Sequence, residues 1–142
     1  MKRTSLHRRL LGAALATSLC AAFSPAGACE FYAEHFQIVH PTAKPALSPE
    51  SGVAIFMEFI QIEAADRLVG ASTSVASRVE VRKSTEAGIE LKPGSDLTLS
   101  AATGHLVLHE LTTQLHEGRQ YPMTLIFEKA GAVDVEFVVG DH

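Results

Sequence analysis

Apolar and polar residues alternate in short blocks from position 29 onward, and glycine, proline or small polar residues separate the blocks. No stretch shows the sustained spacing of an amphipathic helix, whereas a period of two is typical of strands with one buried face. The pattern predicts strands over residues 31–40, 52–62, 66–72, 77–83, 88–91, 96–100, 105–111, 121–128 and 132–139. We therefore expect an all-β fold, either a β-sandwich or a Greek-key barrel.

The period of two also predicts which way side chains point. Val79 and Val81 share one face of their strand, while Glu80 and Arg82 share the other, so this strand has one buried side. Segment 52–62 is apolar at most positions, which is typical of a central strand.

Prolines and glycines mark the connections between the predicted strands. Pro41, Pro45 and Pro49 cannot donate to a sheet ladder, so residues 41–50 are predicted to form an irregular crossing. Residues 86–88 and 92–95 are predicted tight turns, and residues 129–131 are expected to join the last two strands as a hairpin.

Residues 1–28 have the three parts of a secretion signal. A basic start is followed by an apolar run over 10–23, too short to span a bilayer, and by a small-residue exit that ends at Ala28. We expect cleavage before Cys29, export to the periplasm and one mature domain over residues 29–142. Because the mature chain would begin with a cysteine, lipid attachment at Cys29 is an alternative. Ala26, however, stands where a lipobox usually has leucine.

Charge and cysteine content narrow the possible functions. The signal holds four of the 12 Lys and Arg residues and none of the 16 Asp and Glu residues, so the mature chain carries 8 basic residues and a net charge of −8. Nucleic acid is therefore an unfavourable partner. Cys20 is removed together with the signal, so Cys29 has no partner for an internal disulfide.

The sequence contains no G-x-S-x-G, P-loop or H-E-x-x-H motif and no zinc-type cysteine pair. We therefore expect a binding protein that is not an enzyme.

Four segments of the mature chain carry a family likeness. They are Ile-Val-His-Pro-Thr-Ala-Lys at 38–44, the stretch 52–83, Gly-His-Leu-Val-Leu-His-Glu-Leu at 104–111, and the stretch 115–131. Together they resemble the periplasmic copper chaperones of the PCu(A)C type over nearly the whole mature chain. The resemblance implies a cupredoxin-like Greek-key β-sandwich or barrel that carries copper(I) and delivers it to the copper centre of cytochrome c oxidase.

The resemblance also implies a ligand set, which this sequence keeps only in part. The family holds copper(I) with a His and a Met around a hairpin and with a His-x-Met pair on a later strand, and soft thioethers suit that ion. Here Arg82 stands at the first His position, and a protonated guanidinium cannot ligate a metal. The hairpin over residues 83–88 is too short for the Met-bearing loop, and Val107 replaces the second Met. His105 is therefore the retained ligand.

His109 is a possible substitute, because many relatives carry a second Met at that position. Residues four apart on a regular strand are separated by roughly 13 Å, whereas two donors to one metal must each approach within about 2 Å of it. His105 and His109 could share an ion only across a bulge or a strand end. We take both as candidate metal ligands.

Other potential copper donors are His35, His40, His116, His142, Met57, Met123 and Cys29. A site built from histidines would suit copper(II) where the methionines have gone. We expect Met57 and Met123 to pack in the core and His116 to be solvated in a turn.

Three hypotheses follow. The first is a copper-binding chaperone with an altered site, whose partners are the copper ion and a respiratory-oxidase copper-site subunit or another copper carrier. The second is a relative that has lost copper and acts as a partner-binding accessory module. The third is an unrelated envelope enzyme. If Arg82 faces His105, its fixed charge would also attract a carboxylate or a phosphate.

Overall fold

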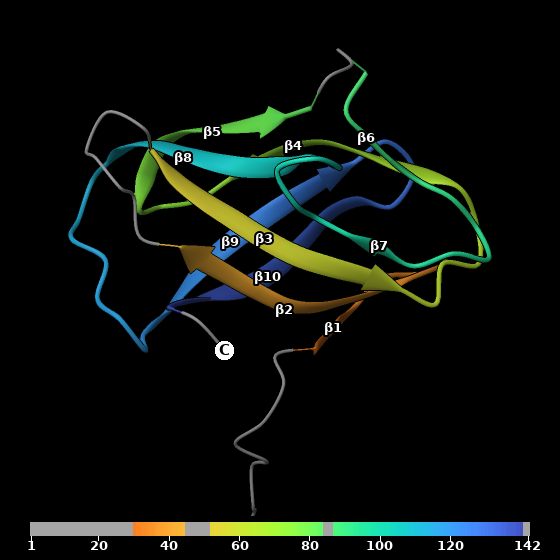
Figure 1. The fold of residues 1–142 in the computed structure, drawn as a ribbon, viewed down its shortest axis with the longest axis horizontal. Helices are drawn as coiled ribbons and strands as arrows, with labels where there is room; N and C mark the ends of the chain where they lie inside the picture. The colour runs from red at the N-terminus through yellow and green to blue at the C-terminus, as the bar shows by residue number, and fades with distance from the viewer. Residues whose placement is uncertain (1–29, 45–51, 84–86, 141–142) are drawn as a thin grey trace, which may run out of the picture.

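The computed structural model describes residues 30–44, 52–83 and 87–140, which form ten β-strands (Figure 1). The strands are β1 (Glu30–Tyr32), β2 (Gln37–Lys44), β3 (Val53–Ile60), β4 (Asp66–Ser72), β5 (Ala76–Arg82), β6 (Ile89–Leu91), β7 (Leu97–Thr98), β8 (His105–Leu111), β9 (Gln120–Phe127) and β10 (Gly131–Val139). The expectation of an all-β fold is confirmed for this part of the chain. None of the described residues belongs to a helix that is long and apolar enough to cross a membrane.

One sheet contains all of these strands. Its order is β5-β8-β3-β2-β10-β9-β4-β6, with β1 added beside β2 and β7 beside β3. The pair β10 and β2 is parallel, and the other pairs are antiparallel. Because β4 also packs against β5, the sheet curls around itself into a nearly closed barrel (Figure 1). β3 lies between β8 and β2, which confirms the central strand predicted from its apolar sequence.

The barrel interior is filled by alternate residues of the strands. On β3 every second residue is buried and the residues between them are half-buried. Phe36 and Phe127 pack with ring centroids 4.7 Å apart, and Phe59 lies 6.0 Å from each of them. Val79 and Val81 pack against this core, as the alternation on their strand predicts.

The sequence prediction was wrong between residues 31 and 44. The expected single strand over 31–40 is two strands, and β2 continues through Pro41 to residue 44, where a crossing was expected. A β-bulge explains this, because the register between β2 and β3 shifts between Val39 and Thr42, and His40 has a φ of +52°. A bulge is one of the places where a strand accommodates a residue without a backbone N–H. Residues 45–50 lie outside the described part of the chain.

The predicted hairpin between the last two strands is confirmed, and a buried carboxylate stabilises its turn. Gly131 has a φ of +73° and pairs with Phe127. Asp66, at the start of β4, accepts hydrogen bonds from the backbone N–H groups of Lys129 (2.8 Å) and Ala130 (2.9 Å). The turn is thereby tied to the strand that borders β9.

Candidate metal centre

The candidate ligands lie on the outer face of the β5–β8 pair. In an antiparallel pair, directly opposite residues point to the same side of the sheet. Arg82 is opposite His105, and Arg78 is opposite His109, with Glu80 between the two arginines on β5. The alternate residues of β8, such as Leu106 and Leu108, are fully buried in the core.

His105 is held by an aromatic neighbour on β3. Its imidazole stacks on the ring of Phe56 with centroids 5.2 Å apart and an interplanar angle of 24°. The ammonium of Lys44 lies 5.5 Å from the centroid of the same phenyl ring. The Nδ1 atom of His105 is buried and has no hydrogen-bond partner among the described residues. A ring nitrogen in this state is unusual in a protein interior and can accept a ligand.

His109 is bound to a carboxylate. Its Nε2 atom lies 2.8 Å from Oε2 of Glu80, and Nη2 of Arg82 donates to the same oxygen at 3.0 Å. The hydrogen bonds from His109 and Arg82 hold the pKa of the Glu80 carboxyl below its usual value. His109 is mostly buried, whereas the Arg82 side chain is half exposed. The imidazole of His109 is therefore part of a charged hydrogen-bond network.

The structure does not bring His105 and His109 together. The β5–β8 register runs without a shift between the two residues. Their separation on a regular strand is about 13 Å, so no single ion can touch both imidazoles. Of the two candidate ligands, His105 has an unpaired ring nitrogen and His109 does not.

The carboxylate that Arg82 attracts comes from Glu80 of the same chain. Arg82 is opposite His105, as the hypothesis of an anion site requires, but its guanidinium is paired with Glu80. An external anion at this position would compete with an existing ion pair.

The remaining candidate donors do not surround His105. Met57 and Met123 are buried in the core, as predicted. His35, His40 and His116 are exposed, which agrees with the expectation for His116. Cys29 and His142 lie outside the described residues. Within residues 30–44, 52–83 and 87–140 no three His, Cys, Asp or Glu side chains gather in a way that could hold a metal ion.

Two residues of this site were missed by sequence reasoning. The alternation places Glu80 on the outer face but does not say that it meets His109, because that contact depends on the register between β5 and β8. Phe56 sits on a strand read as uniformly apolar, and its outward position becomes informative only once β3 is known to neighbour β8.

Solved structures of copper-chaperone domains have this fold. The copper-bound PCuAC domain from PmoF2 is 27% identical, with a TM-score of 0.70, and the match covers 80% of this chain and 98% of that one. The apo PCuAC domain from PmoF1 is 21% identical with a TM-score of 0.71, covering 80% and 99%. The solution structure of CuI-DR1885 from Deinococcus radiodurans is 22% identical with a TM-score of 0.56, covering 70% and 74%. The fold is therefore cupredoxin-like and of the PCuAC copper-chaperone type.

A match between the sequence and a protein-family model supports the same assignment. The model described as LpqE-like matches residues 36–139, so the chain belongs to the LpqE-like family. No curated protein matches the sequence significantly. The resemblance to PCu(A)C copper chaperones and the expected cupredoxin-like fold are both confirmed.

Proposed function

We propose that the protein is an exported copper carrier that binds one copper ion through His105 and hands it over, without covalent chemistry of its own. The observation that carries this proposal is the buried Nδ1 of His105, which has no partner among the described residues. An unpaired buried nitrogen costs free energy, and a bound ion would supply the missing partner. Neutral imidazole is a suitable ligand for copper. The copper-bound PCuAC domain from PmoF2 supports the assignment by its likeness.

An incomplete ligand set suits a carrier. The described residues supply His105 to the ion, and Phe56 fixes the orientation of its ring. Coordination positions that the chain leaves open can be taken by ligands of the receiving protein, which is what hand-over of a metal requires. Cys29 and His142, outside the described residues, are further candidate donors. The proposed receivers are a respiratory-oxidase copper-site subunit or another copper carrier.

The proposal includes export to the periplasm. Residues 1–28 carry the pattern of a cleavable signal, which leaves the domain over residues 29–142. Lipid attachment at Cys29 is part of this proposal, because the description of the matching family names a lipoprotein. Labelled palmitate should be incorporated by the wild type and not by Cys29→Ser. Equal labelling of both would contradict attachment at this residue.

A second candidate function is a partner-binding module that has lost copper. The observation that favours it is the arginine opposite His105, whose fixed positive charge repels a cation. The ion pair with Glu80 offsets part of that charge. Val107, at the position of the second Met, is also fully buried and offers no donor atom.

A copper titration with matched histidine variants separates the two functions. We expect the purified protein to bind about one equivalent of Cu(I) under reductant or of Cu(II) in air, and His105→Ala to weaken that binding at least tenfold. His116→Ala is the control, because His116 is an exposed histidine in a different segment. Equal affinity of the two variants would contradict the assignment of His105, and no binding of either ion would favour the copper-free module.

The charge of Arg82 provides an independent test. If copper binds beside it, Arg82→Leu should tighten binding, because it removes a cation from the neighbourhood of the ion without adding a donor atom. The copper-free module predicts no binding in either protein.

A further inference from the structure

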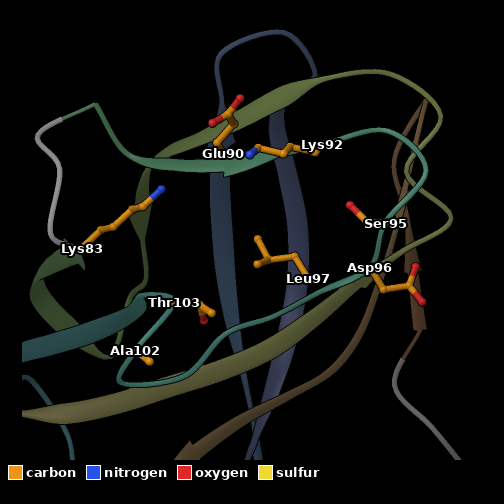
Figure 2. A pocket seen from close by; sticks show the side chains of 8 residues that line it. All are labelled: Lys83, Glu90, Lys92, Ser95, Asp96, Leu97, Ala102 and Thr103. Carbon is orange, nitrogen blue, oxygen red and sulfur yellow. The ribbon is translucent and has the colours of Figure 1, made fainter.

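A pocket lies at one end of the barrel, and its lining contains neither His105 nor Arg82. It has a volume of about 320 Å³, which is at the lower end of the range for small-molecule sites. Its walls come from β6 and the turn that follows it, from β7, from the end of β5 and from the loop before β8 (Figure 2). Neither the LpqE-like family match nor the likeness to PCuAC domains assigns anything to this pocket.

Two ammonium groups enter the pocket from different elements. Lys83 follows β5, Lys92 follows β6, and their side chains extend toward the same space (Figure 2). Neither lysine forms an ion pair with another described residue. Two ammonium groups that extend into one pocket without an ion pair favour a ligand with negative charge.

The acidic residues of the pocket do not fill this role. The Asp96 carboxylate points away from the space between the two lysines, and Glu90 is an exposed residue of β6 (Figure 2). Neither carboxylate forms an ion pair with a described residue. The pocket therefore has two ammonium groups directed into it and two carboxylates at its rim (Figure 2).

The rest of the lining is partly apolar. Leu97, which is half-buried, and Ala102 present hydrocarbon to the pocket. The hydroxyl of Thr103 already donates to the carbonyl of Thr98 at 2.7 Å, whereas that of Ser95 is turned toward the pocket and has no hydrogen-bond partner among the described residues (Figure 2). A ligand that matches this lining has two separated acidic groups, a short hydrocarbon skeleton and an acceptor for one hydroxyl.

We propose that this pocket binds a short-chain dicarboxylate, with one carboxylate at Lys83 and the other at Lys92 and with the carbon skeleton on Leu97. Two anionic groups joined by a short hydrocarbon match two ammonium groups and Leu97, and the hydrocarbon distinguishes this ligand from an inorganic anion. None of the residues that carry this proposal is a candidate metal ligand, so the test can be made without copper.

The test is a titration of the metal-free full-length protein with succinate, followed by amide chemical shifts and by calorimetry. Succinate should shift the amide signals of the pocket residues and bind in the millimolar range or tighter. Lys83→Met and Lys92→Met should each weaken binding at least about fivefold, because each removes one charge pair. Glu90→Gln should tighten binding, because it removes a repelling carboxylate from the rim.

The control is Lys129→Met, which removes an exposed lysine from the β9–β10 turn and should leave the affinity unchanged. Inorganic phosphate should bind at least about fivefold more weakly than succinate, because it has no hydrocarbon skeleton to pack on Leu97. The proposal is overturned if succinate up to roughly 20 mM shifts no pocket signal, if the two lysine variants bind like the control, or if phosphate binds as well as succinate. The dispersion of the amide spectrum shows whether each variant remains folded.

Discussion

Replacing Asp66 by alanine should destabilise the barrel more than any exposed acidic substitution. Asp66 is 8% exposed, and its carboxylate accepts hydrogen bonds from the backbone N–H groups of Arg67 (2.8 Å), Lys129 (2.8 Å) and Ala130 (2.9 Å). The first of these bonds is local to β4, whereas the other two join β4 to the β9–β10 turn. Those two bonds therefore decide how much stability Asp66 contributes to the packing of three strands.

The size of the stability loss follows from the charge of the Asp66 carboxylate, which accepts the hydrogen bonds. A hydrogen bond to a charged group contributes about 1.5–3 kcal/mol, and we take the lower end for two bonds at a turn that water can reach. Asp66→Ala should then lower the free energy of unfolding by about 3 kcal/mol. For a domain of this size, that corresponds to a decrease in Tm of roughly 12 °C.

Urea unfolding and thermal melts monitored by circular dichroism measure both quantities. Asp96→Ala is the matched control, because Asp96 is exposed, forms no ion pair among the described residues, and should change stability by less than about 0.5 kcal/mol. Asp66→Asn keeps the volume but turns one acceptor into a donor, so it should lose much of the same stability. A loss below about 1 kcal/mol for Asp66→Ala would refute the reasoning.

Two further predictions concern the β5–β8 side of the barrel and its neighbours. Gly52→Ala should cost about 2–4 kcal/mol of stability in urea unfolding, because a Cβ there would lie 2.6 Å from a valine methyl and 2.8 Å from a carbonyl oxygen, at a φ of +73°. Gly94→Ala has a similar φ of +81° but no atom within 4 Å, so it should cost only about 1 kcal/mol, and equal losses would contradict the packing argument. Glu80→Gln should remove a stabilising charge at neutral pH, because its hydrogen bond with His109 lowers the Glu80 pKa. A depressed carboxyl pKa gives stability that is lost as pH falls below 4.5, so the difference between wild type and variant should shrink in that range and should not grow.

The sequence was sufficient for the fold because its signals are local. Alternation on β5, the apolar run on β3 and the glycine turn before β10 each depend on neighbouring residues, and all of them are confirmed. The exception is Pro41, which stays within β2. A proline in a bulge differs from a proline in a loop only through its pairing with another strand, and pairing is not a local property.

The candidate site was predictable only in part. The family position of His105 can be read from the sequence, and so can the loss of the methionines. The register of β5 against β8 cannot be read in this way, and it decides that His109 meets Glu80 while His105 meets Phe56. Two histidines with similar sequence settings therefore have different chemical environments, and one of them has an unpaired nitrogen.

The measurement that tests the copper assignment most directly is the ¹⁵N spectrum of the histidine rings before and after addition of one equivalent of Cu(I). We predict that a ring nitrogen of His105 shifts as a metal-bound nitrogen does, while the ring of the exposed His116 keeps its free values. Unchanged His105 signals in a protein that binds copper, or no copper binding at all, would contradict the central claim that this histidine holds the ion.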